Sequence, residues 1–166
     1  MIYRVCSFFG HRTIFLTEEL KERTREQIEH LICVENVAVF LFGSRSKFDE
    51  LCHQVVTKLQ EKYPHIRRIV YLCRSEAACL VGEGARVKEC MLAVAGVDEY
   101  VGEYEEIKRS DKINSAGKAS YVERNEWMID ESDVVFVCMK DGKNYRSGTR
   151  IAYEYAVKRK KQIEMI

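Results

Sequence analysis

Short apolar runs alternate along the chain with longer segments in which apolar residues recur every three or four positions. The short runs have the length and composition of β-strands, and the longer segments have the period of amphipathic helices. The run Val37–Phe42 is apolar at every position, which is typical of a strand buried on both faces. The expected strands are Tyr3–Phe9, Val37–Phe42, Ile66–Cys73, Asp133–Met139 and Ile163–Ile166.

Polar residues that can cap a helix mark where the helical segments begin. Thr17 precedes a helical pattern that runs to Cys33, and Ser46, with Asp49 three positions later, resembles a capping box. The helix after Ser46 is expected to end before Pro64, because proline lacks the N–H that a helix interior needs. Two further helices are expected at Ala119–Asp130 and Gly148–Lys160.

Patterning is weaker between residues 74 and 117. The expected elements there are a helix at 79–94, interrupted by two glycines, and a short strand within 97–104. Residues 108–117 are polar and are expected to form a loop, and residues 141–144 a turn.

This order of strands and helices favours an α/β fold, specifically a three-layer α/β/α sandwich with a mostly parallel central sheet. The 166 residues correspond to one domain, residues 1–166, which is long enough to bury a core without disulfides or metals. In such sheets ligands bind outside the carboxyl ends of the strands. The residues that follow each strand are therefore the first candidates for chemistry.

Two Gly-containing turns lie between a predicted strand and a predicted helix. Free backbone N–H groups and the positive end of the helix dipole meet at such a turn and can hold a phosphate. In the turn that follows the Val37–Phe42 strand, Arg45 adds a guanidinium that can bind phosphate through two hydrogen bonds. The alternative interpretation of each turn is an ordinary helix cap. The two turns are Gly43-Ser44-Arg45-Ser46 and Ser147-Gly148-Thr149.

Two other polar segments complete the predicted ligand site. Gly10, His11 and Arg12 directly follow the first strand. His11 can exchange a proton near neutral pH, and Arg12 can bind phosphate. Arg124 and Asn125 lie on the helix before the Asp133–Met139 strand, and an asparagine can bind a base or a ribose.

Catalysis at this site would require a carboxylate beside the phosphate. Glu154, in the helix that follows Thr149, and Glu126 are the candidate catalytic residues. A solvent-exposed Glu154 is the alternative.

Net charge is +1, so no overall field attracts nucleic acid, and nucleic acid is not an expected partner. The basic run Lys158–Lys161 falls at a predicted helix end, where cations complement the dipole. No apolar run reaches the length of a membrane span, so no membrane association is expected. If the chain oligomerises, a homodimer is the expected assembly.

Seven cysteines occur without the paired spacing of a zinc site, and several lie inside apolar runs. This usage is typical of reduced, buried thiols in a cytoplasmic protein. We therefore expect no metal and no cofactor.

The order of these segments resembles one family. This order of segments is typical of the SLOG superfamily, with the greatest similarity to its YpsA-like proteins of bacteria and phages. The segments are Gly10-His11-Arg12, Gly43-Ser44, Arg124-Asn125 and Ser147-Gly148-Thr149. More distant members are the phosphoribohydrolases that resemble lysine decarboxylases, and DprA. The resemblance implies a Rossmann-like fold that binds a nucleotide or a nucleotide-derived ligand, with the Gly-Thr helix start holding its phosphate.

The catalytic branch of that superfamily carries a glutamate three residues after the threonine, where this chain has Ala152. Nucleoside 2-deoxyribosyltransferases, which the segment from Asp133 to Ala156 also resembles, place a glutamate in the same region. The expected function is therefore a nucleotide-binding module or sensor. The alternative is an enzyme that cleaves or transfers the N-glycosidic bond of a nucleoside monophosphate, using Glu154 or Glu126.

Overall fold

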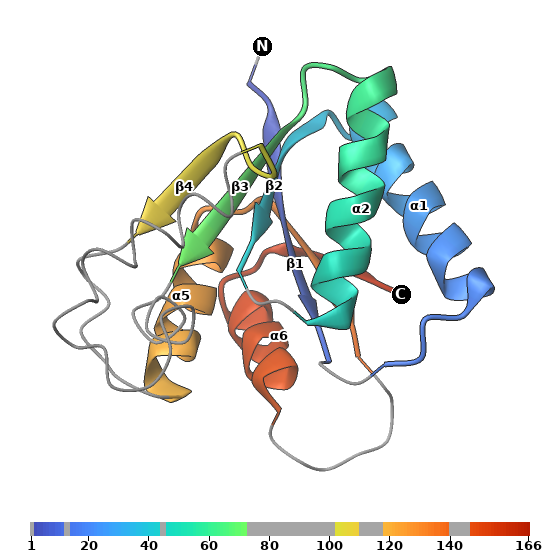
Figure 1. The fold of residues 1–166 in the computed structure, drawn as a ribbon. Coiled ribbons are helices and arrows are strands. Elements are labelled where there is room, and N and C mark those ends of the chain that lie inside the picture. Colours follow the sequence, from blue (N-terminus) through green and yellow to red (C-terminus); the bar gives the residue numbers. More distant parts are fainter. Residues whose placement is uncertain (1, 12–13, 44–45, 73–101, 110–117, 140–146) are drawn as a thin grey trace, which may run out of the picture.

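The computed structural model describes residues 2–11, 14–43, 46–72, 102–109, 118–139 and 147–166 (Figure 1). The expected helix at 79–94 and the expected turn at 141–144 lie outside these ranges. Among the described residues, no helix combines the length and the apolar content that a membrane span requires. The elements are, in chain order, β1 (Arg4–Gly10), α1 (Glu18–Cys33), β2 (Val37–Phe42), α2 (Lys47–Lys62), β3 (Arg67–Leu72), β4 (Glu106–Arg109), α5 (Lys118–Asp130), β5 (Val134–Cys138), α6 (Gly148–Lys158) and β6 (Gln162–Met165).

Six strands form one sheet in the order β4-β3-β2-β1-β5-β6, and every neighbouring pair is parallel. The expected α/β sandwich with a parallel sheet is therefore confirmed, and the architecture is Rossmann-like. β1 lies inside the sheet, between β2 and β5. The chain adds strands outward from β1 to β4 on one side and then crosses β1 to add β5 and β6 on the other.

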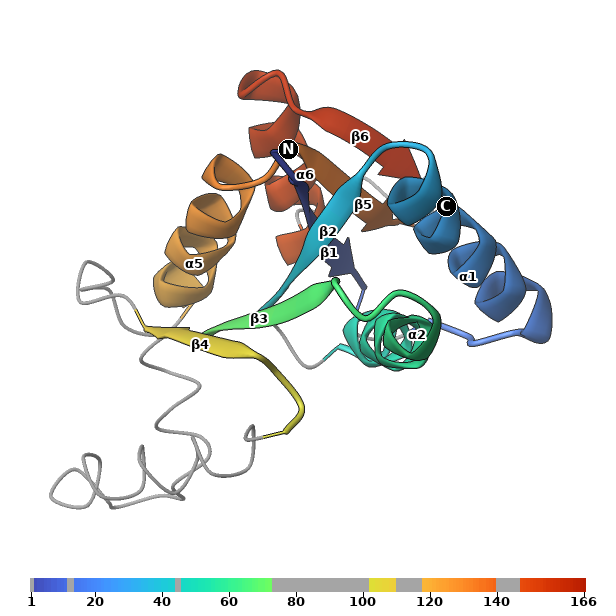
Figure 2. The ribbon, with the colours of Figure 1, turned by 90° about the horizontal axis from the view of Figure 1, so that it is seen from above.

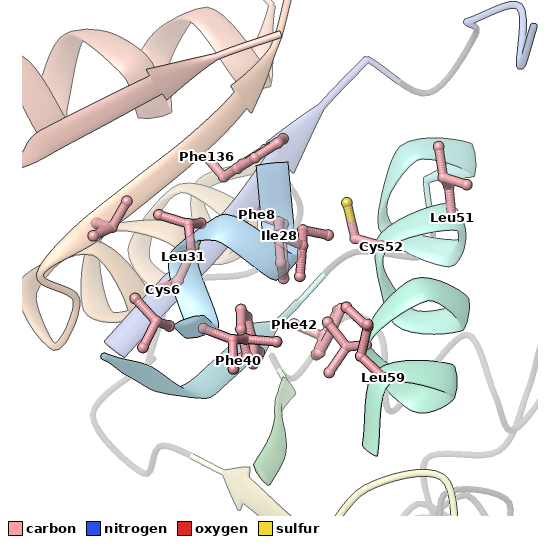
Figure 3. Close-up of a cluster of buried hydrophobic side chains, with 14 of the residues drawn as sticks. Cys6, Phe8, Ile28, Leu31, Phe40, Phe42, Leu51, Cys52, Leu59 and Phe136 are labelled. Atoms are coloured by element: carbon pink, nitrogen blue, oxygen red, sulfur yellow. The ribbon is translucent and has the colours of Figure 1, made fainter. Parts of the chain in front are cut away.

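The helices divide between the two faces of the sheet, with α1 and α2 on one face and α5 and α6 on the other (Figure 2). Alternate residues of β1 supply both cores. Phe8 lies in the α1–α2 core, beside the rings of Phe40, Phe42 and Phe136 at centroid distances of 5.2–5.8 Å (Figure 3). Phe9 lies in the other core with residues of α5 and α6. This burial on both faces is why the inner strands are apolar at nearly every position.

The two expected helix caps, Thr17 and Ser46, are present, and Ser147 caps a third helix. The side-chain oxygens of Thr17, Ser46 and Ser147 each accept a hydrogen bond from a backbone N–H at 3.1 Å, at the starts of α1, α2 and α6. α6 ends at Lys158, two residues earlier than expected, because Lys160 adopts a left-handed conformation with φ of 57° that a helix cannot contain.

The expected loop at 108–117 is wrong at its first residues, because Lys108 and Arg109 belong to β4. The short strand expected within 97–104 lies mostly outside the described residues, and Gly102 and Glu103 at its end form a turn. Pairing with β3 creates β4, with Ile69 opposite Glu106 and Leu72 opposite Arg109. A charged sequence of this kind is typical of an edge strand, where charge opposes aggregation.

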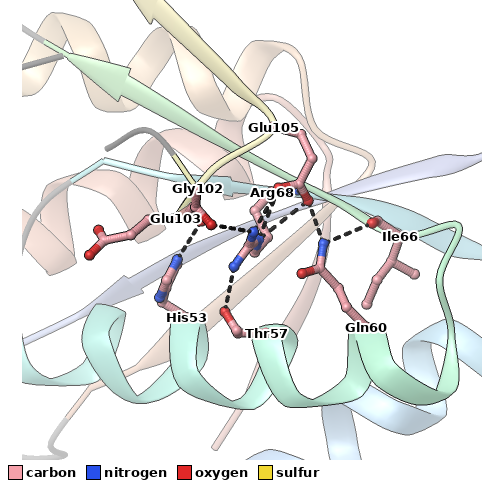
Figure 4. A network of polar contacts seen from close by, with 8 residues as sticks. All are labelled: His53, Thr57, Gln60, Ile66, Arg68, Gly102, Glu103 and Glu105. Carbon is pink, nitrogen blue, oxygen red and sulfur yellow. Dashed lines mark hydrogen bonds and ion pairs between the residues drawn. The ribbon is translucent and has the colours of Figure 1, made fainter. Parts of the chain in front are cut away.

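A buried arginine anchors the segment before β4 to the rest of the domain. Arg68 is 6% exposed and donates hydrogen bonds of 2.8 and 3.2 Å to Glu105, one of 2.8 Å to Thr57 and one of 3.2 Å to the Gly102 carbonyl (Figure 4). His53 of α2 bonds the carbonyl of Glu103 at 2.8 Å. Burial would raise the pKa of the Glu105 carboxyl, but the hydrogen bonds from Arg68 outweigh it and hold that pKa below its ordinary value.

We predict that Glu105→Gln lowers the free energy of unfolding by about 1–2 kcal/mol at pH 7, since it removes the charge that Arg68 faces. Because the folded pKa of Glu105 is depressed, its contribution is complete above the ordinary value of 4.5 and is lost as pH falls through the folded value. Urea unfolding of parent and variant should therefore converge on acidification. The exposed Glu61, replaced by Gln, is the control. A gap that is constant from pH 7 to pH 3 would contradict the assignment.

Candidate functional site

The carboxyl ends of the parallel strands meet at one edge of the sheet, where α2 and α6 also begin (Figure 1). β1 ends at Gly10, β2 is followed by Gly43, and α6 starts after Ser147. β1 and β5 are the neighbours at which the direction of strand addition reverses, and ligands of parallel α/β sheets bind in the crevice at such a point. The fold thus brings three of the predicted ligand-binding segments to the same edge.

Close packing of helices against the ends of β1 and β2 leaves no room for a side chain at Gly10 or Gly43. A Cβ at Gly10 would lie 2.5 Å from Cβ of Phe48 in α2. A Cβ at Gly43 would lie 2.7 Å from Sδ of Met128 and 2.9 Å from Nε of Arg124, both in α5. These glycines therefore let helices approach the strand ends, a packing role that the sequence pattern did not indicate.

Arg124, a predicted ligand-binding residue, is buried beside the end of β2. It is 1% exposed, and its guanidinium packs against Gly43. Nη2 and Nε lie 3.2 and 3.3 Å from the Asn125 amide oxygen, and the guanidinium carbon lies 5.5 Å from the centre of the Tyr121 ring. The structure therefore places the Arg124–Asn125 pair beside the end of β2.

The start of α6 lies at this edge and is open at Gly148 as far as the described residues define it. Gly148 is exposed, and no described atom lies within 4 Å of a Cβ built there. Its first turn carries no acidic residue, whereas α1 and α2 each carry two. Ser147 uses its oxygen to cap the helix, which leaves its hydroxyl hydrogen able to donate to an anion. Thr149, the third residue of the segment, is 8% exposed.

His11 follows β1 at this edge and is half-buried. Ser46, at the start of α2, is 3% exposed, and its Oγ accepts a hydrogen bond from the backbone N–H of Asp49. Arg12, Ser44 and Arg45, also predicted to bind the ligand, lie outside the described residues.

The two candidate catalytic carboxylates lie on helix faces turned away from the sheet. Glu154 is two residues, or about 200° around the helix, from the buried Ala152. Its side chain is 51% exposed and accepts a 3.2 Å hydrogen bond from Arg150. Glu126 stands in the same relation to the buried Arg124. The geometry brings neither carboxylate to the strand ends.

The buried thiols offer no reactive group. Cys6, Cys52 and Cys138 are buried and free of disulfides, and burial raises the pKa of each thiol, most strongly at Cys6 and Cys52. A raised pKa reduces the thiolate that nucleophilic attack or metal binding needs. Within the described ranges, no group of three His, Cys, Asp or Glu side chains is placed to hold a metal ion.

The chain is similar over most of its length to an uncharacterised SPbeta prophage-derived protein, YoqJ, of Bacillus subtilis strain 168. The two are 32% identical over 142 residues, which cover 84% of this chain and 81% of YoqJ. No model of a known protein family matches the chain.

We predict that Gly10→Ala lowers the free energy of unfolding by about 1–3 kcal/mol, because its new Cβ overlaps Cβ of Phe48. That Phe48 atom is attached to the backbone, so only a shift of α2 can relieve the overlap. Gly148→Ala is the matched control, since its Cβ enters open space. Its stability should be unchanged or raised by up to about 1 kcal/mol. Urea denaturation measures both. A Gly10→Ala protein as stable as the parent would show that the packing at this strand end is looser than described.

Proposed function

This chain belongs to the same family as the prophage-derived protein YoqJ, and we propose that it binds a nucleotide or a nucleotide-derived phosphorylated ligand at the carboxyl edge of its sheet. It acts as a binding module or sensor. YoqJ is itself uncharacterised, so the proposal is argued from the site of this chain.

The observation that carries the proposal is the open start of α6. Its first N–H groups have no intrahelical acceptor, and the helix dipole places partial positive charge there. Elsewhere in the chain the first turns of α1 and α2 carry carboxylates that offset this charge. Among the described residues, no atom lies within 4 Å of a Cβ built at Gly148 and the first turn carries no carboxylate, so a phosphate can come close to the backbone.

Other groups at the same edge suit the rest of a nucleotide. The side chain of Asn125 can bond a ribose or a base, and the guanidinium of Arg124 lies beside Gly43. The resemblance of these segments to the SLOG superfamily supports a nucleotide over other phosphorylated compounds. We assign the phosphate to the α6 start and the nucleoside to the region of Gly43.

Binding without turnover is the better-supported form of this function. At the position where the catalytic branch carries its glutamate, Ala152 is 2% exposed and packs in the core under α6. Glu154 faces away from the sheet and is paired with Arg150. Cleavage of an N-glycosidic bond needs a carboxylate beside the sugar to stabilise the positive charge that develops. Release of free base from a nucleoside monophosphate would overturn this assignment.

We predict that Gly148→Glu keeps the fold but loses the ligand. The new carboxylate complements the helix dipole, adding about 0.3–1 kcal/mol to stability, while it repels phosphate from the same N–H groups. Affinity for nucleoside 5′-monophosphates, measured by calorimetry after thermal-shift screening, should fall at least about tenfold.

Gly148→Gln is the matched control, because it adds the same volume without the charge. It should lose some affinity, since its side chain also narrows the approach to the backbone, but clearly less than Gly148→Glu, and the difference between the two measures the repulsion by the carboxylate. Failure of every 5′-monophosphate to stabilise the parent protein, or equal binding by parent and Gly148→Glu, would refute the proposed site.

A further inference from the structure

β6 is an outer strand of the sheet, and among the described residues no strand pairs with its outer side (Figure 2). On its inner side, the N–H groups of Gln162 and Ile166 donate at 3.3 and 3.1 Å to carbonyls on the side of β5. Successive residues of a strand direct their N–H and C=O groups to opposite sides, so those of Ile163 and Met165 point away from β5. Such a row of backbone groups is a template for another strand.

β6 lacks the side chains that keep an outer strand from associating. Its sequence contains no lysine and no proline, the two residues that most often protect such strands. Its one charged side chain, Glu164, accepts hydrogen bonds of 3.2 and 2.9 Å from Gln27 and Gln162 of the same chain. β4, the outer strand at the other end of the sheet, carries three charged residues in four positions. The outer side of β6 is therefore the one suited to pairing.

Exposed apolar side chains lie beside both ends of β6. Ile163 packs in the core under α6, and Met165, two residues further, points to the same face of the sheet and is 48% exposed. Val157, in the last turn of α6, is 50% exposed, and its carbonyl accepts a hydrogen bond from Lys160, shortly before β6 begins. Met165 thus lies at the carboxyl end of the strand and Val157 near its amino end.

We infer that β6 pairs in antiparallel fashion with β6 of a second copy of this chain, which joins the two sheets into one. The axis that relates the copies is a two-fold perpendicular to the sheet, so residues that face each other across it point to the same side. A register centred on Glu164 would set two carboxylates directly opposite each other, which is destabilising. The outward N–H and C=O groups of Ile163 allow a register centred on that residue instead.

The register centred on Ile163 is self-complementary, and this favours a second copy over an unrelated strand. It sets the amide of Gln162 opposite the carboxylate of Glu164 in the second copy. It also sets Met165 opposite Lys161 of the second copy, whose N–H donates to the Ala156 carbonyl, directly beside Val157. The exposed apolar side chain at one end of each strand therefore meets the exposed apolar side chain at the other end of its partner.

This inference goes beyond the proposed function and does not depend on it. A two-fold axis perpendicular to the sheet points the carboxyl edges of the two copies in opposite directions. The start of α6 lies at that edge, whereas β6 contacts the second copy along its side. Pairing through β6 therefore leaves both proposed phosphate sites open.

The test is sedimentation velocity of the parent and of Met165→Lys over a range of protein concentrations. The parent should be a dimer. Met165→Lys places an ammonium opposite Lys161 of the second copy at two equivalent positions, so the dissociation constant of the dimer should rise about tenfold or more. Its Tm at concentrations where both proteins are monomeric should be unchanged, because the side chain is half exposed.

Two further variants make the result specific to this register. Adding Lys161→Glu to Met165→Lys replaces the repulsion by attraction and should restore the dimer. Ile2→Lys is the matched control, since Ile2 is 93% exposed and lies beside Asn36 at the start of β2, so the dimer should be retained. A parent that is monomeric at every concentration, or a dimer that Met165→Lys leaves as tight as before, would overturn the inference. Both results would leave the nucleotide site untouched, because nucleotide affinity is measured separately.

Discussion

Hydrogen bonds between strands that all run in one direction determine the edge of the sheet at which the described helices begin. A parallel pair cannot be joined by a tight turn, so each connection must cross a face of the sheet and return to the starting edge. All carboxyl ends therefore lie at one edge, and the helices that follow them start there. With β1 held between β2 and β5, strand addition reverses beside β1, and the helices cover both faces.

Close packing at this edge decides which groups gather beside the strand ends. The missing side chain at Gly10 lets Phe48 bring α2 against β1, and the missing side chain at Gly43 lets Arg124 bring a guanidinium over β2. The same geometry turns Glu154 away from the sheet. At the start of α6, backbone N–H groups and the Ser147 hydroxyl remain without an acidic residue in the first turn, and these donors suit an anion.

Local signals in the sequence were sufficient for much of the fold. Val37–Phe42 was predicted with the bounds that β2 has, because a strand buried on both faces is apolar throughout. The caps at Thr17 and Ser46 were predicted because they depend on residues three positions away. β4 was not predicted, because its charged residues become a strand only through pairing with β3, which is distant in sequence. The Arg68–Glu105 contact was missed for the same reason.

The candidate site was predictable only as a set of segments. Parallel topology implied that the residues after β1 and β2 share an edge with the start of α6, but not which side chains are buried there. The packing at Gly43 and the burial of Arg124 depend on how α5 sits on the sheet. The sequence of α5 alone contains no signal for that placement.

The most direct test of the account is an NMR titration of the ¹⁵N-labelled protein with adenosine 5′-monophosphate. Phosphate held by backbone N–H groups should shift the amide resonances of Gly148, Thr149 and Arg150 most strongly, with smaller changes at Gly10 and Gly43. Shifts confined to the basic run Lys158–Lys161, or an unchanged spectrum at millimolar nucleotide, would contradict the central claim that the carboxyl edge binds a phosphorylated ligand.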